Sequence, residues 1–444
     1  MYKKNMIVNV IGAGLAGTEC AYILASYGVK VKLYEMKPKK RSDAHKTNDF
    51  AELVCSNSLK SEQITNACGL LKKEMQMLGS LMVEAAYNSK VEAGQALAVD
   101  RGKFSEYATE KIKENENIEV VYDEVTSLDI FDLSKEIVVI ATGPLTSDAL
   151  SESISKFIGE EKLYFYDAAA PIVLKDSLDM NKIYRMDRYG TLGEGSYLNA
   201  AMTEEKYNKF YDILISAESA IGHEFDKRDF FEGCMPIEEM ARRGKQTLLF
   251  GPLKPVGLSK KEGIKPFAVL QLRAENKEET MYNLVGFQTS LKFGEQLRLF
   301  KSIPGFENAE FARYGVMHRN TYINAPKILD NMFRMKNSPN VFFAGQISGV
   351  EGYVESAASG LMVAYNILAE MNNKRVDWKP ETILGSLSKH VSLENKDYQP
   401  MNANFGIIQP LDRKIKDKKM KYEEYAKRSI KEMGVLVNEL EGLR

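Results

Sequence analysis

The feature that most limits how this chain can fold is a glycine-rich turn near its N-terminus. Residues 6–11 (MIVNVI) are short, apolar and β-branched, which predicts a buried strand. GAGLAG follows, then a helical pattern that ends near Gly28, and a second strand-like run (VKVKLYE) ends at Glu35. A strand, a glycine turn, a helix and a strand in this order predict a βαβ unit.

The spacing of the glycines is typical of a dinucleotide-binding site. The first glycine permits the tight turn, the second lets the backbone approach a pyrophosphate, and the third lets the helix pack closely on the strand. The free N–H groups at the start of the helix favour the negative charge of the pyrophosphate. Glu35 lies 23 residues after Gly12, near the ~20 expected for a carboxylate that binds ribose hydroxyls. A glycine turn without a ligand is the alternative. The residues assigned to the site are Gly12, Ala13, Gly14, Leu15, Ala16, Gly17 and Glu35.

Two later segments favour a flavin dinucleotide, FAD. VIATGP at 139–144 is a strand followed by a glycine turn, which is common in flavoproteins that bind two dinucleotides. Residues 341–364 (VFFAGQISGVEGYVESAASGLMVA) contain a strand, a glycine-punctuated loop and a small-residue helix, which can bring backbone N–H groups to a flavin. Many flavoproteins have Asp after the strand-ending glycine, whereas this chain has Gln346; an ordinary strand–helix crossover is the alternative. The residues assigned here are Gly143, Gly345, Gln346, Gly352 and Tyr353.

The order of the predicted elements indicates an α/β protein with an insertion. Its 444 residues suit two or three domains, and 44% hydrophobic with 27% charged residues is typical of a globular protein. From about Ala168 the sequence pattern changes to strand-like runs that alternate with loops, and a buried-strand pattern returns at NVFFAGQ. We therefore expect a Rossmann-type FAD-binding domain of the glutathione-reductase kind, with an inserted α+β domain for substrate or folate. The predicted ranges are 1–167 and 331–444, the latter with C-terminal helices, for the FAD-binding domain and 168–330 for the insertion.

The elements around the insertion are also predicted. Residues 61–90 favour helices, IEVVYDEVTSLDI (118–130) favours strands, and EIVVIATGP (136–144) favours a buried strand. No apolar run approaches the ~20 residues that span a bilayer, so we expect no membrane segment. The four cysteines form no CxxC pair, which argues against a metal site or a disulfide framework and favours the cytoplasm.

Two of the cysteines lie in segments that suit a reactive thiol. Cys55 precedes Ser56, Asn57 and Ser58, which are good N-cap residues, so we predict a helix just after Cys55 that would favour its thiolate. Cys234 lies in FFEGCMPIEEMARRG, close to two arginines. A thiolate adds readily to an electron-poor ring carbon such as C6 of uracil. A buried small hydrophobe is an equal alternative for both cysteines and is the favoured interpretation for Cys20 and Cys68.

Charge is unevenly distributed although the formal net charge is −1. Residues 242–273 hold eight basic residues and one acidic residue, Glu262, in a segment rich in glycine and proline. Such a surface suits a phosphate backbone or the glutamate tail of a folate; a solvated face is the alternative. Residues 412–428, with eight basic and four acidic residues, favour a solvated helix.

These segments together resemble a known family. The chain is similar along nearly its whole length to the bacterial folate- and FAD-dependent tRNA (uracil-5-)-methyltransferases. The matching stretches are VIGAGLAGTE, ELVCSNSLKS, ALAVDRGKF, FEGCMPIEEMARRG, GPLKPVGL, GVMHRNTYINAP and AGQISGVEGYVESAASG. A sister group, the flavoproteins that install carboxymethylaminomethyl groups on the tRNA wobble uridine, shares the AGQ…GY element but is normally longer.

The resemblance implies a mechanism and a set of site residues. Methylenetetrahydrofolate supplies the carbon, reduced FAD supplies reducing equivalents, and NADPH or NADH regenerates the flavin. The usual product is 5-methyluridine in the T-loop of tRNA. Cys55 and Cys234 are implied as the two functional thiols, with Cys234 assigned to uracil and Cys55 to the flavin side, although the opposite order is compatible with the sequence. Contacts to folate or RNA are expected from Arg242, Arg243, His318, Arg319, Asn320 and Asn324, where a structural turn is an equal alternative for 318–324.

Three alternatives stay open at this point. The same chemistry could act on a uridine of large-subunit (23S) rRNA. The chain could be a plain NAD(P)H:FAD oxidoreductase without an RNA substrate, which would call for a CxxC pair or a second GxGxxG that the sequence lacks. It could also be a noncatalytic RNA-binding flavoprotein, which would tolerate the loss of either cysteine.

Overall fold

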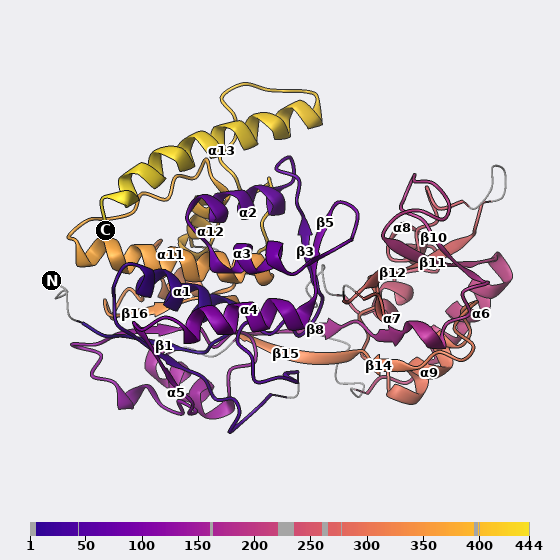
Figure 1. Ribbon diagram of the computed structural model, residues 1–444, viewed down its shortest axis with the longest axis horizontal. Coiled ribbons are helices and arrows are strands. Elements are labelled where there is room, and N and C mark those ends of the chain that lie inside the picture. The colour runs from indigo at the N-terminus through magenta and orange to yellow at the C-terminus, as the bar shows by residue number, and fades with distance from the viewer. Residues whose placement is uncertain are drawn as a thin grey trace.

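The computed structural model divides the chain into two lobes joined by a pair of strands (Figure 1). It describes residues 6–42, 44–159, 163–220, 235–259, 265–276, 278–394, 398 and 400–443, and all of their side chains except those of 163–169 and 316–320. The large hydrophobic core of the first lobe is built from residues between 8 and 154 and between 322 and 443. The core of the second lobe is built from residues between 173 and 309. The connecting strands, β8 (Leu163–Ala169) and β15 (Val316–Tyr322), pair antiparallel along their whole length.

The first lobe is organised around a five-stranded parallel sheet with the order β16-β7-β1-β2-β6. Every residue of β1 and β7 is buried, as expected for a parallel sheet that is covered on both faces. Because all five strands run the same way, the carboxyl ends of β1, β2, β6 and β7 meet at one edge. The strands are β1 (Val8–Ile11), β2 (Val31–Tyr34), β6 (Ile118–Val121), β7 (Ile137–Ile140) and β16 (Val341–Phe343).

Helices α1 (Leu15–Ser26) and α11 (Tyr353–Met371) pack against each other in this lobe. They approach so closely that a Cβ atom on Gly360 would lie 2.1 Å from the carbonyl oxygen of Ala16. Glycine at 360 is therefore what allows the two helices to cross here. The first turns of both helices line one small pocket, to which α1 contributes Leu15 and α11 contributes Tyr353 and Val354.

The remaining elements of the first lobe surround this unit. A small antiparallel sheet has the order β3-β5-β4. The charged C-terminal helix α13 lies along the outside of the lobe (Figure 1). The elements are β3 (Ser58–Ser61), β4 (Lys90–Val91), β5 (Ala96–Val99), α2 (Ala67–Met77), α3 (Leu81–Asn88), α4 (Arg101–Lys113), α5 (Asp148–Ile158), α10 (Ala325–Ile328), α12 (Ile383–Ser392) and α13 (Lys418–Glu441), with 3-10 turns η1 (Leu128–Ile130) and η5 (Gln346–Ser348).

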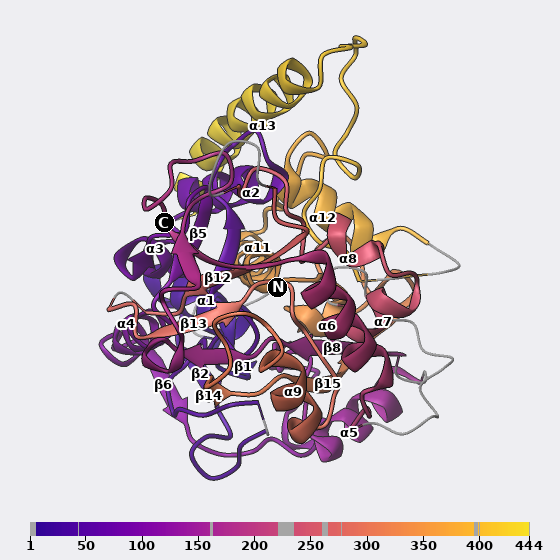
Figure 2. The same cartoon turned by 90° about the vertical axis from the view of Figure 1, so that its right-hand side faces the viewer.

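The second lobe contains a six-stranded sheet with the order β10-β11-β12-β13-β9-β14. One face of the sheet packs on helices and forms the second core, to which Leu272 and Leu284 contribute; the helices lie to one side of β12 and β13 (Figure 2). The elements are β9 (Ile172–Leu174), β10 (Ile183–Arg185), β11 (Tyr197–Met202), β12 (Ala268–Ala274), β13 (Met281–Leu284), β14 (Phe311–Arg313), α6 (Glu204–Ser216), α7 (Ile237–Arg242), α8 (Thr247–Phe250) and α9 (Phe293–Phe300), with the 3-10 turn η2 (Lys175–Ser177).

The predicted fold class and the N-terminal βαβ unit are confirmed. Two local predictions are wrong. The chain after Cys55 enters strand β3 rather than a helix, and residues 118–130 contain one strand followed by the 3-10 turn η1. The domain boundaries at 168 and 330 stay a prediction. No described helix combines the length and the apolar character that a membrane crossing requires.

Buried carboxylates fasten helices of the first lobe to each other. Glu74 on α2 accepts hydrogen bonds from the backbone N–H groups of Ile383 and Leu384, both at 2.8 Å, and from the hydroxyl of Ser429 on α13 at 2.5 Å. Glu19 on α1 plays the same role at the start of α3. Burial raises the pKa of Glu74 to about 7, and that of Glu19 likewise to about 7.

These raised pKa values predict a stability that falls with pH. Between pH ~4.5 and ~7 the folded chain holds a proton on Glu74 that the unfolded chain has released, so raising the pH in this window favours unfolding. Glu74→Gln cannot titrate, so its free energy of unfolding should fall less over the window, by roughly 1–3 kcal/mol. Urea unfolding at pH 5 and pH 7.5 measures the difference. Glu19→Gln should flatten the profile in the same way, and equal slopes in all three proteins would contradict the assignment.

Candidate functional site

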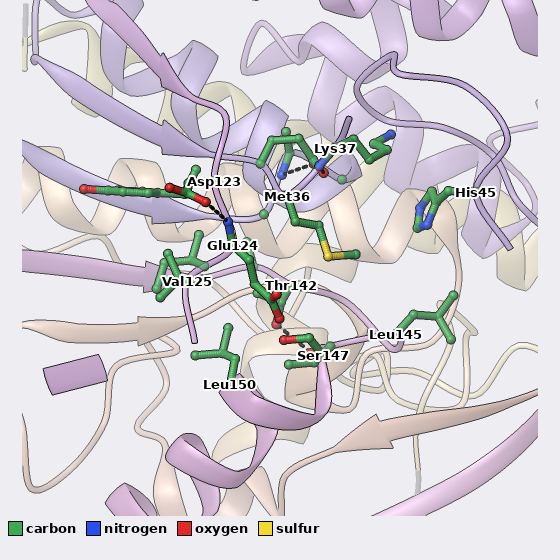
Figure 3. A pocket seen from close by; sticks show the side chains of 18 of the residues that line it. Met36, Lys37, His45, Asp123, Glu124, Val125, Thr142, Leu145, Ser147 and Leu150 are labelled. Atoms are coloured by element: carbon green, nitrogen blue, oxygen red, sulfur yellow. Dashed lines mark hydrogen bonds between the residues drawn. The ribbon is translucent and has the colours of Figure 1, made fainter. Parts of the chain in front are cut away.

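A pocket opens at the carboxyl edge of the parallel sheet, where the dinucleotide site is predicted. It encloses about 650 Å³, including space open to solvent. Its walls come from the residues that follow β1, β2, β6 and β7 (Figure 3). They include Gly12, Ala13, Gly14, Glu35, Lys37, His45, Glu124, Thr142, Leu145 and Ser147.

The three glycines of the motif have different environments. Gly12 has φ +99°, and a Cβ there would lie 2.7 Å from the carbonyl oxygen of Ala141. A Cβ on Gly17 would lie 1.9 Å from the carbonyl oxygen of Gly12, so this position is closed to any side chain. Gly14 is the N-cap of α1, and no described atom lies within 4 Å of a Cβ built there. Gly14 lies in the pocket wall, so the start of α1 faces the pocket at this residue. Leu15 instead lines a smaller second pocket together with Tyr353, and Ala16 is buried against Gly345 and Gly360.

Glu35 forms part of the pocket wall directly after β2. Its side chain is buried, and its two oxygens accept hydrogen bonds from the backbone N–H groups of Ala13 at 3.1 Å and Lys37 at 2.9 Å. Each carboxylate oxygen can accept a second hydrogen bond, so both can still accept from a pair of hydroxyls. The carboxylate is thus fixed in place before any ligand binds. Gly143 follows β7 and turns the chain with φ +68°.

The second glycine segment lies beside the first. Gly345 has φ +83°, and a Cβ there would lie 3.1 Å from Cβ of Ala16. Its N–H donates to the hydroxyl of Ser359 on α11 at 2.6 Å. The side-chain amide of Gln346 donates to Glu351 at 2.6 Å, so this residue braces the loop. Gly352, with φ +116°, is the N-cap of α11. Gly345 therefore lies against the first turn of α1, and seven residues later Gly352 begins α11.

Cys55 lies where this segment meets the second lobe. Its backbone N–H donates to the hydroxyl of Tyr353, the first residue of α11, at 2.5 Å. Its carbonyl oxygen accepts from the guanidinium groups of Arg101 at 3.0 Å and Arg313 at 2.8 Å. Burial raises the pKa of Tyr353, and negative charge on Cys55 raises it further, so the tyrosine keeps its proton at neutral pH.

The second lobe presents charged and polar side chains to the Cys55 segment. Arg273 donates to the hydroxyl of Ser56 at 2.7 Å and to Oδ1 of Asn57 at 2.9 Å. Arg101 pairs with Glu275 at 2.5 Å. Arg273 was predicted to belong to the basic surface of residues 242–273. This prediction is wrong for Arg273, because the residue is buried and its guanidinium donates to Ser56 and Asn57. Sequence reasoning missed Arg101, Glu275 and Arg313. The signal for the strand was present, because polar residues alternate with apolar ones at 271, 273 and 275.

Other predicted residues are placed elsewhere or lie outside the description. Arg242 and Arg243 are exposed at the end of α7, and Arg242 pairs with Glu239. Asn324 is the N-cap of α10, and its Oδ1 is buried without a hydrogen-bond partner among the described residues. Cys20 and Cys68 are buried, and burial raises the pKa of both thiols. Cys234 lies outside the described residues, as do the side chains of His318, Arg319 and Asn320.

The parallel sheet, the glycine turn, the acidic residue after β2 and the pocket at the sheet edge define a Rossmann-type dinucleotide-binding protein. Two crystal structures of Aquifex aeolicus GidA have the same fold. They match 99% of this chain with TM-scores of 0.69 and 0.70 at 16% and 17% identity, covering 76% and 78% of those chains. At this identity the likeness shows the fold alone.

Sequence comparison narrows the class to a family. Residues 7–375 match the family model described as "Glucose inhibited division protein A". Proteins named methylenetetrahydrofolate–tRNA-(uracil-5-)-methyltransferase TrmFO are 53% identical in Staphylococcus saprophyticus subsp. saprophyticus and 55% identical in Acetivibrio thermocellus, in both cases over 96% of this chain and 97% of the relative. The chain belongs to the GidA family and, within it, to the TrmFO group of enzymes.

Proposed function

We propose that this chain is a folate- and FAD-dependent methyltransferase that makes 5-methyluridine in the T-loop of tRNA, with NADPH or NADH regenerating the reduced flavin. The observation that carries the proposal is the position of Cys55. Its backbone N–H donates a hydrogen bond to Tyr353, the first residue of α11, and its carbonyl oxygen accepts one from Arg313 of the second lobe. A thiol at this joint can meet both a flavin and a substrate. The names of the relatives, at more than half identity, support the same activity.

The residues present fit FAD. The free N-terminus of α1, the open position above Gly14 and the fixed carboxylate of Glu35 suit the pyrophosphate and ribose of its adenosine half. Gly143, Gly345, Gln346, Gly352 and Tyr353 are proposed to hold the flavin half, with the N-terminus of α11 favouring negative charge on the ring. Bound FAD would supply the reducing equivalents that convert a transferred methylene group into a methyl group.

The chain itself is proposed to activate the uracil. A thiolate adds to C6 of the ring, which makes C5 nucleophilic toward the methylene carbon of the folate. Loss of the C5 proton with cleavage of the bond between the methylene carbon and the folate nitrogen would release the folate and leave a methylene group on C5. The reducing equivalents that FAD supplies would convert this group into methyl, and departure of the thiolate from C6 restores the ring double bond. We assign Cys234 to C6 and Cys55 to the flavin side. The guanidinium groups of Arg101 and Arg313 both donate to the Cys55 carbonyl oxygen, so they place positive charge near Cys55. Nearby positive charge favours a thiolate.

Contacts to folate or RNA are proposed for the remaining predicted residues. Arg242 and Arg243, exposed on the second lobe, suit the phosphate backbone. The Oδ1 of Asn324, which meets no donor within the described part of the chain, suits a donor on a ligand. His318, Arg319 and Asn320 are retained as proposals from the family resemblance. A cytoplasmic location is proposed on the same basis.

The names of the relatives favour tRNA over rRNA as the substrate, and nothing in the comparisons supports the rRNA alternative. They also favour an RNA-modifying enzyme over a plain NAD(P)H:FAD oxidoreductase or a noncatalytic RNA-binding flavoprotein. The position of the modified uridine and the identity of the reductant rest on the family resemblance.

Gly14 gives a test of the FAD site that leaves the fold intact. Its φ of −74° suits any residue and a side chain meets open space, so Gly14→Leu should fold. The leucine would fill the room proposed for the pyrophosphate, and FAD occupancy should fall roughly tenfold or more. Flavin absorbance per mole of purified protein measures this. Gly434→Leu is the matched control, since its side chain also meets open space among the described atoms but lies on α13. Flavin retained by Gly14→Leu would refute the placement.

A methylation assay tests the proposed reaction. With methylenetetrahydrofolate labelled in its methylene carbon and NADPH, label should appear as 5-methyluridine in unmodified tRNA transcript and not in unmodified large-subunit rRNA. Cys234→Ala should abolish labelling while keeping its FAD, because it removes the thiol assigned to C6.

Cys20→Ala, at a buried thiol outside the site, is the control and should stay active. Label in rRNA alone would contradict the tRNA assignment. Label in neither RNA, from protein with full FAD, would contradict the reaction itself. An active Cys234→Ala together with an inactive Cys55→Ala would exchange the two thiol roles.

A further inference from the structure

The sheet of the second lobe carries a row of side chains, four polar and one apolar, on the face opposite its hydrophobic core. Strand register places Tyr197 opposite Arg273, Arg273 opposite Asn283, Asn283 opposite Ile172, and Ile172 opposite Arg313. Residues directly opposite each other on paired strands share a face, so these five form one row across β11, β12, β13, β9 and β14. Their neighbours Leu272 and Leu284 point into the core on the other face.

Both ends of this row contact the first lobe. The hydroxyl of Tyr197 donates to the carbonyl oxygen of Ala93 at 3.4 Å. The guanidinium of Arg273 holds Ser56 and Asn57. The guanidinium of Arg313 holds the carbonyl oxygens of Val54 at 2.8 Å and Cys55 at 2.8 Å.

Residues 54–57 therefore cross over the row, from Arg313 at one end to Arg273 at the other. Asn283 lies between these two arginines in the order of the strands. It consequently lies beneath the middle of the crossing segment, at Cys55 and Ser56. For Tyr197, Arg273 and Asn283 the face follows from regular backbone pairing. Arg313 pairs with Ile172 beyond an irregularity of β14 between Phe311 and Arg313, and its contacts to Val54 and Cys55 place its guanidinium on the same face.

Asn283 is buried at 3% exposure, and its Nδ2 has no hydrogen-bond partner among the described residues. Nε of Arg313, in the same row, also lacks one there. An unpaired buried donor costs free energy, and such groups are rare in folded proteins. Two of them facing one active-site segment indicate that an acceptor comes from outside the chain.

We propose that Asn283 binds a substrate heterocycle that lies beside residues 54–57, with Nδ2 donating to a ring carbonyl oxygen. A carboxamide carries a donor and an acceptor side by side, which complements the C=O and N–H of a cyclic amide. The uracil of the RNA and the pterin of the folate both contain this unit. The inference rests on the proposed function for the identity of these two rings, and the test separates them.

The variant Asn283→Leu removes the donor at nearly constant size. Because no described protein hydrogen bond is lost, the melting temperature should stay the same or rise. One of two KM values, for tRNA or for methylenetetrahydrofolate, each measured with the other saturating, should rise about tenfold, the effect of losing one buried hydrogen bond. A higher KM for tRNA would identify the uracil as the ring that Asn283 binds, and a higher KM for methylenetetrahydrofolate would identify the pterin. The dissociation constant of the same ligand, measured by equilibrium binding to the FAD-loaded protein, should rise by the same factor.

Asn283→Asp, which keeps the size and one oxygen but loses the donor, should give the same shift in KM and provides a second variant if leucine disturbs the strand. Asn199→Leu is the matched control. Asn199 lies two residues from Tyr197 on the same face, is fully buried, and donates from Nδ2 to the carbonyl oxygens of Tyr184 at 3.3 Å and Met186 at 2.8 Å. Its replacement should lower the melting temperature and leave both KM values unchanged.

A lower melting temperature of Asn283→Leu with both KM values and both dissociation constants unchanged would overturn the inference and make Asn283 a structural residue. Failure of the proposed function would look different, because wild-type protein would then transfer no label. The binding measurements would still report on Asn283 in that case.

Discussion

Two guanidinium groups converge on one carbonyl oxygen, that of Cys55, and the arrangement of the site depends on this contact. Arg101 belongs to the first lobe and Arg313 to the second, so the segment is held from both sides at once. Arg101 also pairs with Glu275 of the second lobe, and the glutamate side chain is almost fully buried. Removing one member of a buried charge pair leaves the other uncompensated, so the contact strongly favours the docked arrangement of the lobes. The position of Cys55 thus depends on residues of both lobes.

A second constraint acts inside the first lobe. Helices α1 and α11 can cross closely only because residue 360 has no side chain. The starts of the two helices, at Leu15 and Tyr353, line one small pocket. The start of α1 also faces the pocket at the sheet edge, and α11 begins at Tyr353, which bonds to Cys55. Both ends favour negative charge. A dinucleotide that spans the two ends would carry its phosphates to α1 and its ring toward α11, and hence toward the thiol.

Much of the first lobe could be predicted because its signals are local. The glycine spacing and the acidic residue after β2 follow from the turn geometry of a βαβ unit, and the structure places Glu35 in the wall of the pocket with Gly12 and Gly14. The helix predicted after Cys55 failed for a physical reason. Ser56 and Asn57 are good N-cap residues, but their side chains make tertiary hydrogen bonds instead. Ser56 accepts from Arg273 of the second lobe, and Asn57 donates to the carbonyl oxygens of Val99 in the first lobe and Ala274 in the second. Those tertiary bonds outweigh the local preference.

The contacts made by the polar row of the second lobe could not be predicted from the sequence. Alternation at 271, 273 and 275 indicates a strand with a polar face. It does not indicate what the face meets, because that depends on pairing between strands more than a hundred residues apart, such as Ile172 with Asn283. Register is set by the whole sheet. Arg313 and Asn283 could therefore be recognised as site residues only once the lobes were placed together.

The measurement that tests this account most directly is hydrogen exchange of the backbone, compared between FAD-stripped and FAD-loaded protein. Slow exchange reports local opening, and a ligand protects the segments that it holds closed. We expect added protection in three separate segments, namely 12–19 after β1, 345–356 up to and including the first turn of α11, and 53–57 around Cys55. Protection confined to 12–19 and the pocket residues near Glu35, with 53–57 unchanged, would contradict the claim that the flavin lies at the joint between the lobes.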